Sequence, residues 1–148
     1  MVGDQDTDEQ DEFLADFASR IFLLDQSVRF VCIANARAEL QAIKIRPHLR
    51  EHLRIIKMEE LVKSWVLQIV MFDKYYRLTG ALDYYLLKFE LLFGAGIPLT
   101  RNMTIDDDSK PTHSRVFLFM SFEPGSNVVE IIEDKIIPLI KQKTDYFM

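Results

Sequence analysis

Apolar residues recur at helical spacing in two stretches of the first half of the chain. Between Phe13 and Val28 they follow one another at intervals of three, four and seven residues, which predicts an opening helix. Met58 to Arg77 carries a wider apolar face, and this width predicts a long helix that is buried on more than one side. Gly80 follows shortly after and is expected to stop the second helix.

A third helix is predicted near the C-terminus, beginning at Val128. Asn127 precedes it, and Glu130 follows Asn127 at the spacing of a capping box. Apolar residues then recur on one face of this segment. Pro138 is expected to kink the helix or end it early, because proline has no backbone N–H to donate.

The stretch RFVCIANARAELQAIKIR favours two strands joined by a tight turn. Phe30–Ile33 is a run of strand-forming residues, and from Leu40 to Ile45 successive side chains fall on opposite faces. The turn between them contains no glycine, and Asn35 is the residue best suited to a positive φ. The alternative is a short helix over Ala36–Ile45. Pro47 disfavours that helix, because the residue before a proline avoids the helical conformation, and we therefore predict a hairpin.

Three more strands are predicted between the long helix and the C-terminal helix. The first spans Leu82–Phe93, with its charged residues on one side. Gly94-Ala95-Gly96 is expected to turn the chain into a second strand at Ile97–Met103. Residues 106–114 have the composition of a loop, and Val116–Phe122 alternates densely enough for a central strand.

The order of these elements predicts an α+β fold with a single five-stranded antiparallel sheet and helices packed on it. We expect one domain over residues 13–148, which is long enough to bury a full core, after a disordered acidic tail at residues 1–12. Without the six negative charges of the tail, the formal net charge of −5 becomes +1. The acidic residues of the tail are Asp4, Asp6, Asp8, Glu9, Asp11 and Glu12.

The composition is that of an ordinary soluble protein, with 49% apolar and 28% charged residues. The single cysteine, Cys32, excludes an internal disulfide framework and fits a reducing compartment. The acidic start of the chain is unlike a signal peptide, and no apolar run reaches the roughly 18 residues of a membrane span. We therefore expect a cytoplasmic protein with no membrane partner. A nucleic-acid-binding domain usually has a strong basic bias, and the acidic net charge of this chain argues against nucleic acid as a partner.

The segment HLREH matches the H-x-x-E-H pattern of inverted zinc peptidases. In that pattern His48 and His52 would hold Zn²⁺, and Glu51 would act as the general base. Pro47 precedes the motif directly, and the chain is short for a peptidase cleft, so a solvated connector is the favoured interpretation. The connector as a whole, residues 46–57, is basic and could meet phosphates, although an exposed face is favoured here too. No catalytic residue and no cofactor are predicted.

Over roughly residues 13–140, the order of elements resembles that of the roadblock/longin and profilin-like group. In that group a hairpin, a long central helix, a three-stranded meander and a terminal helix recur in the same order. The group typically has a glycine in the hairpin turn, whereas this chain has Ala36 and Ala38. The hairpin stretch and the segment RVFLFMSFEPGSNVVEIIEDKIIPLI are also similar to small archaeal proteins with no known activity. The resemblance implies partners that associate through the sheet edge and the central helix.

The leading functional hypothesis is a non-enzymatic interaction, scaffold or regulatory module that forms a homodimer or pairs with a related protein. The wide apolar face of residues 58–77 motivates it, because exposed apolar area marks interfaces. The candidate interface residues are Trp65, Ile69, Phe72 and Tyr76. One alternative is a small-molecule sensor with an apolar pocket lined by tyrosines and phenylalanines. Another is a zinc hydrolase built on the HxxEH segment.

Overall fold

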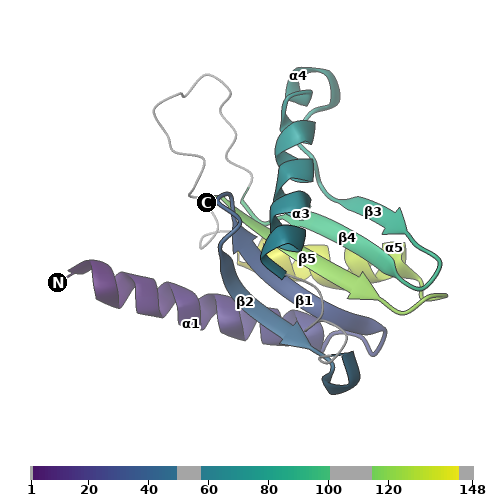
Figure 1. Cartoon of the computed structure of the whole chain (residues 1–148), viewed down its shortest axis with the longest axis horizontal. Coiled ribbons are helices and arrows are strands. Elements are labelled where there is room, and N and C mark those ends of the chain that lie inside the picture. The colour runs from purple at the N-terminus through teal and green to yellow at the C-terminus, as the bar shows by residue number, and fades with distance from the viewer. Residues whose placement is uncertain (1, 50–57, 101–114, 144–148) are drawn as a thin grey trace.

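The computed structural model describes residues 2–49, 58–100 and 115–143, and it contains one five-stranded antiparallel sheet (Figure 1). The spatial order of the strands is β2-β1-β5-β4-β3, so β5 lies at the centre and β2 and β3 lie at the edges. This sheet confirms the predicted α+β fold class. The strands are β1 (Val28–Asn35), β2 (Leu40–Ile45), β3 (Tyr85–Lys88), β4 (Phe93–Pro98) and β5 (Val116–Phe122).

Helices cover both faces of the sheet. The first helix, α1, and the C-terminal helical segment pack on one face, and α3 crosses the other (Figure 1). The helical elements are α1 (Val2–Phe22), η1 (Pro47–Leu49), α3 (Met58–Asp73), α4 (Tyr76–Thr79), α5 (Val128–Ile131), the π-helical turn η3 (Ile132–Ile136) and α6 (Ile137–Gln142).

The central strands are apolar on both sides because each side faces a helical layer. In β1, Val31 and Ile33 belong to the core beneath α1, whereas Phe30 and Cys32 belong to the core beneath α3. Phe117 and Phe119 of β5 join the α3 side in the same way. A strand buried on both faces shows a dense apolar run instead of a clean alternation, which is what the sequence of β5 shows.

Helix α1 begins at Val2, so the residues expected to form a disordered tail continue the first helix. The helix ends at Phe22, earlier than the predicted Val28. The Asp25 side chain accepts hydrogen bonds from the backbone N–H (2.9 Å) and the hydroxyl (2.7 Å) of Ser27, and this turn leads the chain into β1.

The predicted hairpin at β1 and β2 is confirmed, and the helical alternative for its second half is excluded. The residue with positive φ in the turn is Ala38 (φ 63°), where the sequence favoured Asn35. Asn35 has a different role in the turn. Its side-chain oxygen accepts hydrogen bonds from the backbone N–H groups of Arg37 and Glu39, both at 3.0 Å, and so closes the loop locally.

The predicted turn at Gly94-Ala95-Gly96 is wrong, because all three residues lie inside β4. The chain reverses earlier, where the backbone N–H of Phe89 donates to the carbonyl of Leu92 at 2.8 Å. Gly96 pairs with Tyr85 of β3, and a Cβ atom at Gly96 would overlap the Tyr85 ring. Gly96 therefore leaves room for an aromatic ring from the neighbouring strand, and it does not form a turn. The predicted loop at 106–114 and residues 101–103 lie outside the described residues.

The C-terminal helical segment begins at Val128 as predicted. Asn127 makes no side-chain cap to the backbone, and its amide donates instead to the Glu130 carboxylate at 2.6 Å. Pro138 neither ends nor breaks the segment, which continues to Gln142. The π-helical turn η3 ends two residues before Pro138. Its wider turn relieves the clash that the proline ring would make with the preceding turn of an α-helix.

Candidate functional site

Helix α3 is held on the sheet by a strip of apolar side chains. Val62, Val66 and Ile69 are buried against the core that contains Phe117 and Phe119. At the far end of the helix, Asp73 accepts a hydrogen bond from the largely buried guanidinium of Arg115, which also lies over the Phe117 ring at 4.9 Å. These contacts fix which side of α3 faces the sheet and which side faces outward.

The outward side of α3 is apolar in its second half. We call the exposed apolar residues of this region the outer patch, and we include in it the first residues that follow α3. Leu67 is 58% exposed and Met71 is 51% exposed, although both are large aliphatic side chains. Leu67, Val70 and Met71 have the spacing that places side chains together on one helix face. The outer patch consists of Leu67, Val70, Met71, Phe72, Tyr75 and Leu78.

The first half of the outward side is polar, which limits the outer patch to one end of the helix. Glu59, Glu60, Lys63 and Ser64 are all exposed there. Phe72 extends the patch in the other direction, because its ring contacts the Tyr85 ring edge-on at a centroid distance of 6.0 Å. Tyr85 belongs to the edge strand β3, so the patch and the edge of the sheet are neighbours.

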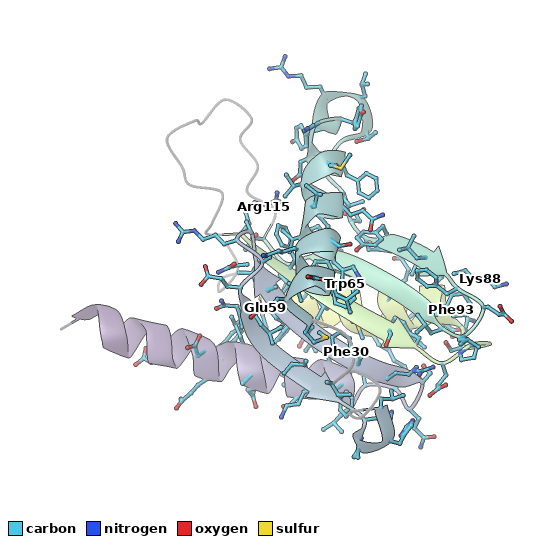
Figure 2. All side chains as sticks on the ribbon, in the orientation of Figure 1. Phe30, Glu59, Trp65, Lys88, Phe93 and Arg115 are labelled. Carbon is cyan, nitrogen blue, oxygen red and sulfur yellow. The ribbon has the colours of Figure 1, made fainter. Side chains whose placement is uncertain are left out.

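The four predicted interface residues occupy different positions. Trp65 is half-buried between the rings of Phe30 (5.9 Å) and Phe119 (5.5 Å), and Figure 2 shows it above Phe30 on the α3 side of the sheet. Ile69 is fully buried, and Tyr76 is half-buried. Only Phe72 is exposed. Leu67, Val70 and Met71 were not among the predicted interface residues, although the wide apolar face of residues 58–77 was the available signal.

A cavity of about 300 Å³ lies between α3, the β3–β4 hairpin and the middle of the sheet. Its walls are mainly aromatic and aliphatic, and Arg29 and Ser121 are among the residues that contribute polar groups. The phenol of Tyr85 lies in the wall, where burial raises its pKa to about 12. The remaining lining residues are Phe30, Leu49, Leu61, Trp65, Leu87, Phe89, Leu92, Gly94, Ala95, Phe119 and Met120.

The predicted zinc motif is only partly within the described residues. His48 is exposed on η1, whereas Glu51 and His52 lie outside the described part of the chain. Among the described residues, no group of three or more metal-ligating side chains comes together. Arg46 of the basic connector has a structural role, because its side chain donates hydrogen bonds to the backbone carbonyls of Val28 (2.7 Å) and Gln26 (2.6 Å).

No helix in the described ranges is both long enough and apolar enough to cross a membrane. No protein-family model matches the chain, and no curated protein matches it either.

Solved structures do match. MglB of Myxococcus xanthus superposes with a TM-score of 0.66 at 12% identity, over 94% of this chain and 90% of that one. A Roadblock/LC7 domain from Streptomyces avermitilis gives a TM-score of 0.62 at 6% identity, over 89% of this chain and 95% of that one. A structure of MglB with a tetrameric arrangement gives a TM-score of 0.65 at 8% identity, over 92% of this chain and 88% of that one. The chain therefore has a roadblock/longin-type α+β fold.

Proposed function

We propose that this chain is a non-enzymatic interaction module that pairs with a second chain of the same fold, in the first instance another copy of itself. The observation that carries the proposal is the outer patch on α3. Large apolar side chains that remain exposed together on one helix face mark a surface that another protein covers. The MglB structure with a tetrameric arrangement is a chain of this fold that assembles, which supports a second copy as the occupant.

The position of the outer patch supports pairing through the helix and the sheet edge together. The contact between Phe72 and Tyr85 joins the patch to β3, which lies at the edge of the sheet and pairs on one side only within the described residues. An edge strand offers backbone N–H and C=O groups to a partner, and the adjacent patch offers apolar area. The polar first half of α3 would then stay in solvent at the rim of the interface.

The test is a charge substitution on the outer patch that leaves the core intact. The double variant Leu67→Glu, Met71→Glu changes two exposed residues, so its thermal unfolding should match that of the original chain. Its self-association should weaken by about 2 kcal/mol or more, the cost of losing interface hot spots. Light scattering coupled to size-exclusion chromatography measures the mass of each protein directly.

The matched control is Leu23→Glu, because Leu23 is also an exposed leucine (79%) but follows α1 on the other side of the sheet. We expect a dimer for the original chain and for the control, and a monomer for the double variant. A strict monomer for the original chain at roughly tens of micromolar contradicts self-pairing, since weak specific complexes form in that range. Equal masses for all three proteins as dimers would place the interface elsewhere.

A further inference from the structure

The cavity beneath α3 has the size and the lining of a small-molecule site. Its volume of about 300 Å³ is at the lower end of the range for ligand pockets, about 300–1,000 Å³. Such pockets are mostly apolar with a few polar groups that orient the ligand, and this one combines aromatic and aliphatic walls with Arg29 and Ser121. We propose that the cavity binds a small amphipathic carboxylate, with its apolar body against Trp65 and its carboxylate at Arg29.

The floor of the cavity is open because two small residues meet there. Gly94 of β4 pairs with Ser121 of β5, and both line the cavity. Among the described residues, a Cβ atom added at Gly94 would meet one neighbour, the Phe89 ring at 3.7 Å. The missing side chain therefore leaves a depression in the sheet, with Trp65 of α3 among the surrounding walls.

Arg29 is placed at the cavity by an irregularity in β1. The pairing of β1 with β5 shifts register between Val28 and Phe30, which releases Arg29 from the regular alternation of the strand. Its Nη1 then donates to the carbonyl of Leu91 at 3.2 Å, in the β3–β4 hairpin. The side chain is only 19% exposed, so its charge lies at the border between water and the apolar wall.

The guanidinium of Arg29 is not fully satisfied by the protein. The Glu123 carboxylate lies 3.6 Å from its Nη1, which is longer than a hydrogen bond, and Glu123 itself is 44% exposed. The Nε of Arg29 is buried and has no hydrogen-bond partner within the described residues. A carboxylate at this end of the cavity would accept charge-assisted hydrogen bonds from the guanidinium and complement its charge.

This inference does not rest on the proposed pairing. The cavity lies on the sheet side of α3, whereas Leu67 and Met71, the residues changed in the pairing test, lie on its outward side. The two sites adjoin where Phe72 contacts Tyr85, so pairing is tested at Leu67 and Met71 and ligand binding at Arg29 and Gly94, away from that contact.

Trp65 makes the test direct, because it is the only tryptophan in the chain and lines the cavity. Decanoate and decanol have the same apolar body and differ in the head group. Each is titrated into the full chain while Trp65 fluorescence and the heat of binding are followed. We expect decanoate to bind at least about tenfold more tightly than decanol, a difference of about 1.4 kcal/mol.

Two variants separate the head group from the apolar body. Arg29→Met keeps an apolar stem and removes the charge, so the preference for decanoate over decanol should disappear. Gly94→Val fills the floor of the cavity with a strand-forming side chain, so binding of both probes should be lost. If Arg29→Met does not fold, Glu123→Gln replaces it. This variant removes the competing carboxylate from a half-exposed site and should strengthen decanoate binding.

Circular dichroism and thermal unfolding confirm that each variant is folded before titration. The proposal is overturned if the original chain gives neither a fluorescence change nor heat with decanoate. It is also overturned if decanoate and decanol bind equally well, or if decanoate binding survives in folded Gly94→Val.

Discussion

At the scale of single residues, two glycines of β4 have opposite roles although they are two positions apart. Gly96 lies directly beneath the Tyr85 ring, and any side chain there would overlap the ring. Gly94 faces the open cavity and has room for one. Neither residue has a positive φ, so the difference between them is one of space and not of backbone conformation.

We expect Gly96→Ala to destabilise the protein by about 1–3 kcal/mol, the usual cost of forcing extra atoms into a packed site. The added methyl would displace the Tyr85 ring from β4 and disturb its contact with Phe72. Gly94→Ala is the matched control. It should be neutral or slightly stabilising, because alanine restricts the unfolded chain more than glycine does. Urea unfolding at equilibrium measures both changes, and an equal loss for the two variants would contradict the packing role of Gly96.

At the scale of elements, the sequence predicted the β1–β2 hairpin but misplaced the β3–β4 hairpin. For the first hairpin, local rules were sufficient, because Pro47 disfavoured the helical alternative, a run of strand-forming residues indicated the first strand, and alternation indicated the second. For the second, Gly94 and Gly96 lie close together and resemble a turn. The reason for Gly96 is Tyr85 on the neighbouring strand, and a single-strand pattern carries no information about that neighbour.

The loop before β1 is joined to the C-terminal helical segment by Asp25 and Lys135. Lys135 donates to the Asp25 carboxylate at 3.0 Å, and Ser27 donates to it from its backbone and its hydroxyl. The backbone hydrogen bond from Ser27 has the largest effect on the pKa of Asp25. Together these contacts lower that pKa from 3.8 to about 2. Because the native state holds the carboxylate in its charged form, the stabilisation is complete above about pH 4 and is lost as the pH falls towards 2.

We therefore expect Asp25→Asn to lower the free energy of unfolding by about 1 kcal/mol at pH 7. This is less than the full pKa shift of Asp25 would correspond to, because the carboxylate is partly exposed to water. The difference between the two proteins should shrink between pH 4 and pH 2. Urea unfolding of both proteins at pH 7, 4, 3 and about 2 measures it. The exposed Asp11 on α1 supplies the control substitution, Asp11→Asn, and a difference that stays constant with pH would contradict the assignment to Asp25.

At the scale of the whole molecule, the candidate sites depend on how separate elements come together. The cavity joins Arg29 of β1, Trp65 of α3 and Gly94 of β4, which are far apart in the sequence. No local pattern connects them. The outer patch was closer to being predictable, since the apolar face of residues 58–77 is wider than one side of a helix that packs on a sheet. The side that faces outward is decided by the contacts of Ile69 with the sheet and of Asp73 with Arg115, and these form only in the folded chain.

Cys32 provides a measure of how the whole sheet opens. Its side chain is fully buried in β1, which is paired with β2 on one side and β5 on the other, and burial raises the pKa of the thiol to about 12. Separation of the edge strand β2 alone leaves β1 paired with β5 and covered by α3. A thiol reagent should therefore modify the native protein only through global unfolding. The labelling rate, measured against pH and urea, should give the same unfolding free energy as equilibrium denaturation, within about 1 kcal/mol.

The chain unfolded in denaturant is the control and should react at once. Labelling of the native protein at the rate of the unfolded chain would show that β1 opens independently of the rest of the sheet.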